Sequence, residues 1–170
     1  MKRPLLVSAT IALIFLGEAV FAQQSRLKPD TLISKRAQTV YVEMLGPGLT
    51  ISGNYDTRFS KRRDGLGGRI GIGYIAADGS SITTIPVGIN YLLGNGKNFF
   101  EVGAGATYLN FSDDQDEYLS AEGDGVLGNL TFGYRLQPVD SGFSFRGGFS
   151  PLFGYGSFIP WLGFSFGYAF

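Results

Sequence analysis

Seven charged residues lie on the small, polar faces of the strands that the sequence predicts. Three are acids and four are arginines, and the predicted strands contain no lysine. Buried charges need partners, and the arginine guanidinium can form bidentate hydrogen bonds with a carboxylate where lysine cannot. The chemistry expected of this set is an ion-pair network inside the fold, formed by Glu43, Asp56, Arg58, Arg69, Glu101, Arg135 and Arg146.

A second set of acids is gathered in one polar stretch, Ser112 to Asp124. Carboxylate oxygens are hard ligands that suit divalent ions such as Ca²⁺. The spacing matches no EF-hand loop, so a solvated loop kept soluble by its charges is the favoured interpretation. The candidate ion ligands are Asp113, Asp114, Asp116 and Glu117, and no metal is assigned to them.

Catalysis and nucleic-acid binding find little support in the composition. The chain has no histidine and no cysteine, which removes the commonest general base and the thiolate metal ligand. Fourteen basic and fourteen acidic residues leave no net charge to attract nucleic acid. The stretch GDGVLG, residues 123–128, has the letters of a dinucleotide-binding fingerprint but opens a predicted strand, where that fingerprint needs a helix. We therefore expect no enzymatic activity and no cofactor.

The elements that must position the charged residues are strands, because bulky and small residues alternate along most of the chain. In the last stretch, Leu162, Phe164, Phe166, Tyr168 and Phe170 lie on one face, as alternation along a strand requires. The same pattern predicts eight strands, at residues 39–45, 49–59, 67–77, 81–93, 98–111, 124–136, 142–151 and 158–170.

Side-chain volume decides which face of these strands points inward. The interior of an eight-stranded barrel is barely wide enough for ordinary side chains, so the many Phe, Tyr, Leu, Ile and Val residues cannot all fit inside. Glycine, serine and a few paired charges would fit. The sequence thus predicts an all-β fold, an eight-stranded antiparallel up-and-down transmembrane β-barrel with an apolar outside and a plugged polar interior.

The first 22 residues form a segment that differs in pattern from the rest of the chain. Two basic residues precede an apolar run from Leu5 to Leu16, and Val20-Phe21-Ala22 has the pattern of a cleavage site. The run is too short for a spanning helix, which needs about 20 residues. We expect residues 1–22 to be a cleavable signal peptide for export, 23–38 a periplasmic lead-in segment, and 39–170 the barrel.

The C-terminal residues carry a resemblance. Phe164, Phe166, Tyr168 and Phe170 resemble the C-terminal assembly signal of outer-membrane β-barrel proteins, and stretches such as FFEVGAGATYLNF and FIPWLGFSFGYAF resemble small outer-membrane barrel proteins of Bacteroidota. The resemblance implies a place in the cell outer membrane. The implied partners are outer-membrane lipid, lipopolysaccharide and, during biogenesis, the barrel-assembly machinery. A monomer is expected.

The connections between strands predict the orientation. Short turns near residues 62, 95 and 139 would face the periplasm together with both termini, and connections near 47, 78, 112–124 and 154 would face outward. The longest connection then falls on the outer side, as is usual for such barrels. The weakest point is Gly46-Pro47-Gly48, which we interpret as a turn, since a bulge there would leave seven strands and an unpaired edge.

The favoured hypothesis is a structural or surface-interaction protein of the outer membrane. A narrow pore for a small solute is the first alternative, with the four interior arginines giving anion preference. An envelope lipid-modifying enzyme is a less favoured one, because the small barrel enzymes that the chain resembles in size use histidine. A soluble periplasmic barrel that binds an apolar ligand remains a fourth hypothesis.

Overall fold

The computed structural model describes residues 36–77, 80–113, 123–154 and 156–170. The described strands are β1 (Gln38–Leu45), β2 (Ile51–Arg58), β3 (Gly65–Ala77), β4 (Ser80–Asn95), β5 (Asn98–Asp113), β6 (Gly123–Leu136), β7 (Gly142–Phe149), β8 (Leu152–Gly154), β9 (Ser157–Ile159) and β10 (Leu162–Ala169). A single turn of 3₁₀ helix, η2 (Gly46–Gly48), joins β1 to β2. Among these residues no helix is long and apolar enough to span a bilayer.

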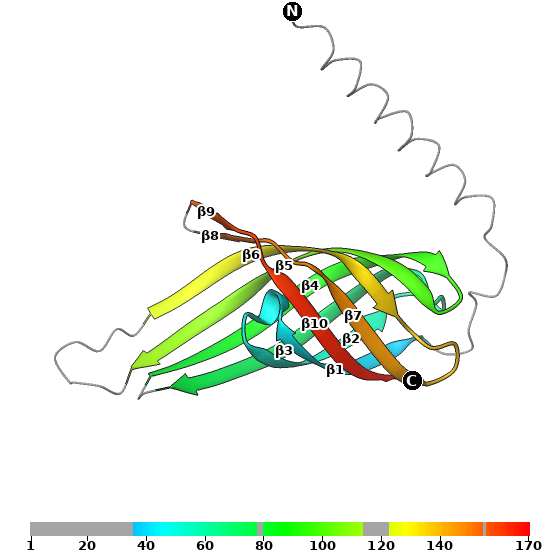
Figure 1. Ribbon diagram of the computed structural model, residues 1–170, viewed down its shortest axis with the longest axis horizontal. Coiled ribbons are helices and arrows are strands. Elements are labelled where there is room, and N and C mark those ends of the chain that lie inside the picture. Colours follow the sequence, from blue (N-terminus) through cyan, green and yellow to red (C-terminus); the bar gives the residue numbers. More distant parts are fainter. Residues whose placement is uncertain (1–35, 78–79, 114–122, 155) are drawn as a thin grey trace, which may run out of the picture.

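All strand pairings are antiparallel, and the sheet closes on itself. Each strand pairs with its neighbour in sequence from β1 to β6, β6 pairs with β7, β7 with β10, and β10 with β1. The result is a barrel whose strands are tilted relative to its long axis (Figure 1). The fold class expected from the sequence, an eight-stranded antiparallel barrel, is confirmed.

The ten strand segments amount to eight strands because two strands are each broken once. The pairs Phe132 with Phe149 and Gly128 with Phe153 keep one register between β6 and the β7–β8 strand. The breaks occur at Ser150-Pro151 and Pro160-Trp161, where proline has no N–H to give to the ladder. The β8–β9 pairs therefore extend the hairpin formed by β7 and β10.

This extension corrects one expectation. The stretch PLFGYGS near residue 154 was expected to be a loop, but Leu152–Gly154 and Ser157–Ile159 pair with each other as strands. Alternation continues through both prolines, and Phe153 packs its ring 5.3 Å from that of Phe158. Only the short connection between β8 and β9 remains for the turn.

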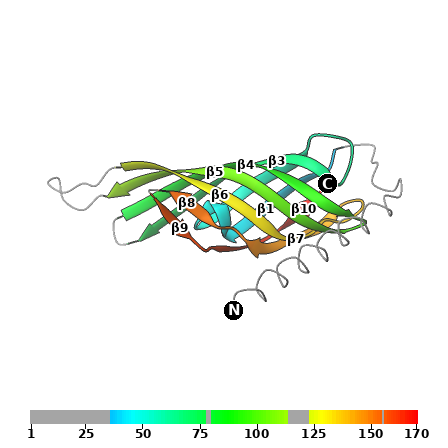
Figure 2. The ribbon, with the colours of Figure 1, turned by 90° about the horizontal axis from the view of Figure 1, so that it is seen from above.

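The barrel has two unlike ends. We call the end that carries Arg36 and Phe170 the terminal end and the opposite one the loop end (Figure 1). The turns at the terminal end are short; β4 and β5 are joined there by only Gly96 and Lys97, with Gly96 at a φ of 66°, a value that favours glycine. At the loop end β3 to β6 reach beyond β1, β2 and β10 (Figures 1 and 2).

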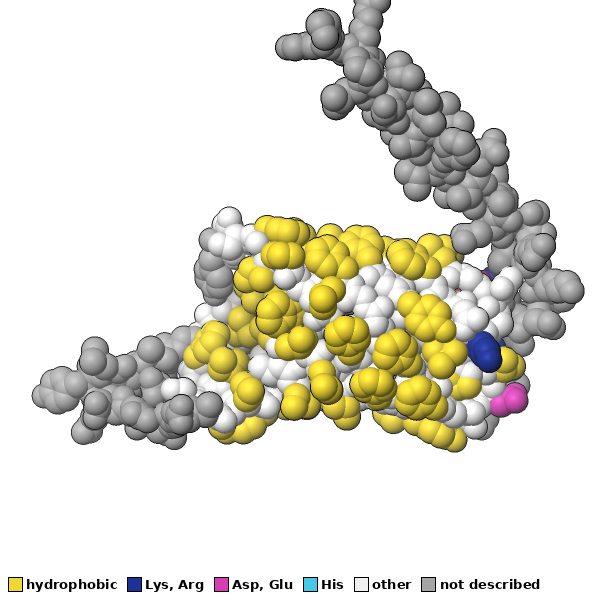
Figure 3. Space-filling model, viewed as in Figure 1, with side chains coloured by type: hydrophobic (Ala, Val, Ile, Leu, Met, Phe, Trp, Pro, Cys, Tyr) yellow, Lys and Arg dark blue, Asp and Glu magenta, His cyan; other side chains and the backbone are white. Residues whose placement is uncertain are grey.

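Burial is inverted relative to a soluble protein. The only large apolar side chains described as buried are Tyr41, Leu92, Phe99, Leu109 and Leu152, whereas buried polar and charged residues occur on nearly every strand. The outward positions carry exposed Phe, Tyr, Ile, Leu and Val. On the face seen in Figure 3 they form a broad apolar surface. Large apolar patches on a surface mark contact with another phase or another protein.

Candidate functional site: the polar interior of the barrel

The interior holds a compact cluster of charged side chains that we call the lumen network, consisting of Asp56, Arg58, Asn90, Glu101, Arg135 and Arg146. These residues come from β2, β4, β5, β6 and β7. They meet because each occupies an inward position of its strand, and inward positions from opposite walls of so narrow a barrel are within reach of one another.

Asp56 is the centre of the lumen network. Its Oδ1 atom lies 2.8 Å from Nη2 of Arg58 and 2.9 Å from Nη2 of Arg135, and its Oδ2 atom lies 3.3 Å from Nη2 of Arg146. The Asp56 side chain has no exposure to solvent. One buried carboxylate therefore accepts hydrogen bonds from Arg58 and Arg135 and forms an additional ion pair with Arg146, which gives a buried acid the charged partners that it requires.

Glu101 and Asn90 connect the remaining members. Glu101 lies 3.5 Å from Arg146 and 3.8 Å from Arg135, counted between the nearest oxygen and nitrogen atoms. The amide of Asn90 donates to Asp56 at 2.6 Å and to Glu101 at 2.9 Å, and its carbonyl oxygen accepts from Arg58. Asn90 thus links the two carboxylates, whose negative charges would otherwise repel each other.

A separate ion pair lies nearer the loop end. Arg69 on β3 donates to both carboxylate oxygens of Glu43 on β1, at 3.2 and 3.4 Å. Both side chains are buried. Between this pair and the lumen network lies the ring of Tyr41, over which the guanidinium of Arg146 sits 4.1 Å from the ring centroid, a distance suited to a cation–π contact.

The connection between β1 and β2 covers the polar interior on the side of the loop end. Sequence analysis placed Gly46-Pro47-Gly48 in an outward loop; the segment is a turn, as favoured, but all three residues are buried. Thr84 donates to the carbonyl oxygen of Gly48 at 2.9 Å, and Thr107 donates to that of Pro47 at 2.5 Å. The turn folds into the barrel because these inward hydroxyls satisfy its carbonyl groups.

The terminal end is narrowed by a buried arginine. Arg63, in the turn between β2 and β3, donates from Nη2 to the carbonyl oxygens of Gln137, at 2.6 Å, and of Pro138. Burial lowers the pKa of the Arg63 guanidinium, and the charge of Asp140 partly opposes that effect. A cavity of about 480 Å³ lies beside it, with Arg36, Gln137 and Phe170 among its lining residues.

Toward the loop end, the inward-facing side chains of the barrel become apolar and more exposed. By alternation from inward-facing Gly73, Thr107 and Leu152, the side chains of Ile75, Phe111 and Ile159 also point inward, yet they are 45%, 40% and 42% exposed. In addition, β9 pairs only with β8 among the described residues, and the last residues of β3 pair only with β4. The rim at this end therefore offers unpaired strand edges and apolar side chains.

The residues proposed from the sequence fall into four groups. All seven interior charges are buried, five in the lumen network and two in the Glu43–Arg69 pair. Phe164, Phe166, Tyr168 and Phe170 lie on the outward side of the last strand, each about half exposed. Of the loop acids, Asp113 ends β5, while Asp114, Asp116 and Glu117 lie outside the described residues, as do the proposed signal peptide and most of the lead-in segment.

Sequence reasoning missed Asn90, Tyr41 and the threonines that hold the inward turn. Asn90 had been assigned to the polar face of its strand, so its inward position was available, but nothing in the sequence pointed to a bridge between two carboxylates. Within the described part of the chain, no group of three or more acids, histidines or cysteines is placed to hold a metal ion.

Comparison with known proteins supports the fold alone. No protein-family model and no curated protein sequence matches this chain. Among solved structures, the N-terminal β-barrel domain of OprF from Pseudomonas aeruginosa is similar with a TM-score of 0.56 at 12% identity, over 79% of this chain and 96% of that one. Ail, the attachment invasion locus protein of Yersinia pestis, gives a TM-score of 0.47 at 13% identity, over 79% and 97%.

Proposed function

We propose that the chain is an integral outer-membrane protein, a barrel with a plugged polar interior that serves a structural or surface-interaction role without catalysis. One observation carries this proposal: apolar side chains cover the outside of the barrel while charges fill the inside. Closed barrels are the only sheets that can cross a bilayer, because they leave no backbone group unpaired. Burying the apolar belt in lipid would remove its exposed area from water.

Two tyrosines support the position of one membrane boundary. The hydroxyl of Tyr55 donates to Gln38 at 2.8 Å and that of Tyr134 donates to Asn98 at 2.9 Å, both on the outer surface toward the terminal end. A tyrosine with an apolar ring in lipid and a polar tip in the headgroup region is typical of the aromatic girdles of such barrels. The terminal end would face the periplasm and the loop end the outside.

The same orientation agrees with export and assembly. Residues 1–22 would direct the chain out of the cytoplasm, and Phe164, Phe166, Tyr168 and Phe170 would present alternate aromatic side chains to the barrel-assembly machinery. Phe170 also closes the barrel, since its backbone exchanges hydrogen bonds with Gln38 at 2.9 and 3.1 Å. The resemblance to Bacteroidota barrels stays a prediction, as does a monomeric state in outer-membrane lipid and lipopolysaccharide.

The interior favours a plug over a pore or an active site. Every carboxylate of the lumen network is engaged by at least one arginine, so none is free to act as a general base. The inward turn at Pro47 covers the network on the loop side. Among the described residues, the surface that we propose for interaction is the rim at the loop end, with the exposed side chains of Ile75, Phe111 and Ile159.

Cell fractionation tests the location. The wild type should be recovered in the outer membrane and should migrate differently on gels before and after heating. Deleting Phe170 should remove the protein from that fraction, whereas Phe170→Tyr, which keeps an aromatic end, should not. Recovery of the wild type in the soluble fraction without detergent would contradict the proposal and favour a barrel that binds an apolar ligand.

The pore alternative has its own measurement. Purified protein in planar bilayers should show no steady conductance, because each of the four interior arginines is paired with Asp56, Glu101 or Glu43. Reproducible conductance steps would instead support the pore. An altered composition of lipid A or phospholipid on deletion of the gene would support the lipid-modifying alternative.

A further inference from the structure

The ion pairs of the interior do not balance. The lumen network contains two carboxylates, Asp56 and Glu101, and three guanidinium groups, Arg58, Arg135 and Arg146. The neighbouring pair, Glu43 with Arg69, is neutral. Arginine does not lose its proton in proteins, so one positive charge is left over in the interior. Burying an uncompensated charge is costly, which calls for a negative charge near these arginines.

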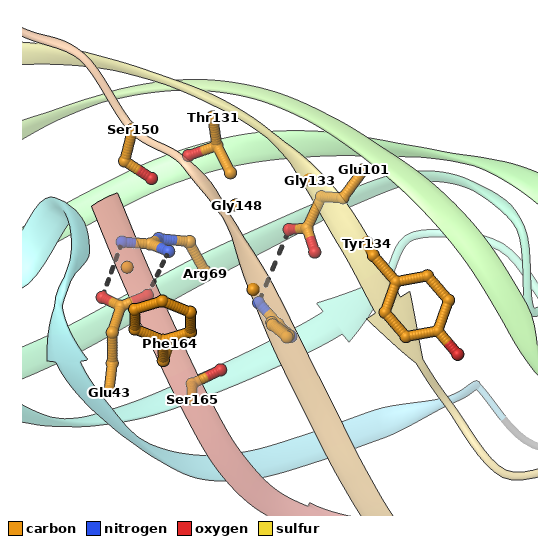
Figure 4. A pocket seen from close by; sticks show the side chains of 13 residues that line it. Glu43, Arg69, Glu101, Thr131, Gly133, Tyr134, Gly148, Ser150, Phe164 and Ser165 are labelled. Carbon is orange, nitrogen blue, oxygen red and sulfur yellow. Dashed lines mark hydrogen bonds and ion pairs between the residues drawn. The ribbon is translucent and has the colours of Figure 1, made fainter. Parts of the chain in front are cut away.

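A cavity lies where that charge is needed. It has a volume of about 20 Å³, and both the Glu43–Arg69 pair and the Glu101–Arg146 pair are among its lining residues. Figure 4 shows Glu43, Arg69 and Glu101 around it. Its lining includes glycines of β6, β7 and β10, where neighbouring strands approach closely. A cavity of this volume holds about one water molecule or one monatomic ion.

Polar atoms without partners border this cavity. Arg146 and Ser165 both line it, and both are more than nine-tenths buried. Among the described residues, Nε of Arg146 and Oγ of Ser165 have no hydrogen-bond partner. Nη2 of Arg146 makes no hydrogen bond either, but it lies 3.3 Å from Oδ2 of Asp56 in an ion pair. Arg146 is held in place by Glu101 on one side and by the ring of Tyr41 below it. Unsatisfied buried donors in a native fold call for an explanation, and a bound water molecule or ion is the usual one.

We propose that this cavity is a binding site for one monovalent monatomic anion, chloride in the cell. The charge of the anion would neutralise the excess guanidinium of the lumen network, and Arg146 and Ser165 would donate to it. The small volume excludes sulfate and organic anions. Glu43 and Glu101 line the cavity together with Arg69 and Arg146, so the positive charge of the lining is already offset there and the site would hold no more than a single negative charge.

The test uses the whole mature barrel refolded in detergent. The midpoint of thermal unfolding is measured at constant ionic strength while sodium gluconate is replaced by sodium chloride or bromide. The midpoint should rise and saturate with halide concentration, as binding to the native state alone requires, and gluconate should have no such effect. Crystals grown with bromide should show an anomalous peak between Arg146 and Ser165.

Two variants tie the effect to the site. Ser165→Ala removes one hydrogen bond, which should raise the half-saturating halide concentration roughly twofold to tenfold. Ser141→Ala, in an exposed turn at the terminal end, should leave it unchanged. Arg146→Gln removes the excess charge and should abolish the halide dependence, whatever its effect on overall stability.

Three results would overturn the proposal. The first is an unfolding midpoint that does not distinguish chloride from gluconate, together with no bromide peak, which would mean that the cavity holds water. The second is an unchanged halide response in Arg146→Gln. The third is a tyrosinate absorbance band at neutral pH that disappears in Tyr41→Phe, because the excess charge would then be balanced by the protein itself.

Discussion

Arg135 and Asp56 join opposite walls of the barrel: Nη2 of Arg135, on β6, lies 2.9 Å from Oδ1 of Asp56, on β2. The two residues are 79 positions apart in the sequence. Arg135 also donates to the hydroxyl of Thr39 on β1 at 3.2 Å. This side-chain contact therefore crosses the interior of the barrel. The backbone hydrogen bonds of the sheet join only adjacent strands and cannot make such a connection.

Asp56→Asn should be among the most destabilising substitutions in the interior. It removes the charge that Arg58, Arg135 and Arg146 share and leaves three guanidinium groups beside a single carboxylate. Breaking a buried ion pair in this way costs about 3–5 kcal/mol, to be measured by urea unfolding of the barrel in lipid vesicles. Asp64→Asn is the matched control, because Asp64 has a single ion-pair partner among the described residues, Arg62, which is 44% exposed and can be hydrated when the pair is broken, so the loss should be smaller than for Asp56→Asn. Equal losses in the two variants would argue against a tightly coupled network.

A charge on the outer surface should be harmful only inside the apolar belt. Ile89, in the middle of β4, is 55% exposed, and Ile89→Arg should lower the free energy of unfolding in vesicles by about 2–4 kcal/mol if that surface faces the bilayer centre. Ser81→Arg, on the same face but near the loop end of β4, should cost about 0–1 kcal/mol. The same small cost for both variants would mean that the belt does not lie in lipid.

Much of this architecture was readable from the sequence because a strand has a period of two. The bulky residues at alternate positions from Leu162 to Phe170 identify one outward face, and the volume of those side chains excludes them from so narrow an interior. The same alternation placed Glu43, Asp56 and Arg146 on the inward face. The local pattern was sufficient here because every strand repeats the same arrangement, with bulky apolar residues on one face and small or polar residues on the other.

The ion pairs and hydrogen bonds between side chains inside the barrel could not be predicted in the same way. Which arginine meets Asp56 depends on the register and tilt of strands far apart in sequence, and no local pattern encodes these. The inward turn at Pro47 depends on Thr84 and Thr107, which lie 36 and 60 positions from its carbonyl groups. The role of Asn90 depends likewise on two carboxylates from other strands.

The threonines that hold the inward turn can be tested singly. Thr107→Val keeps the shape of the side chain but leaves the carbonyl oxygen of Pro47 and the amide of Asn129 without the hydroxyl they now contact. The expected loss is about 1–3 kcal/mol of unfolding free energy, the usual penalty for buried polar groups left unpaired. Thr83→Val, on the outward face of β4, should change it by less than about 0.5 kcal/mol. A neutral Thr107→Val would mean that the turn is held by other contacts.

The close approach of the last strand to the inward turn gives a further prediction. A Cβ atom at Gly163 would lie 2.6 Å from Cα of Gly46 and 3.0 Å from its nitrogen, so Gly163→Ala should force the turn out of the interior. We expect a loss of about 1–3 kcal/mol from overpacking and new chymotrypsin cleavage after Leu45 or Leu49, which flank the turn.

Gly53→Ala is the control, because a Cβ atom there meets nothing within 4 Å. It should be as stable as the wild type or slightly more so, since alanine loses less conformational entropy on folding than glycine. Protease resistance of Gly163→Ala equal to that of Gly53→Ala would show that the turn can stay inside despite the added methyl group, and that the contact with Gly163 does not hold it there.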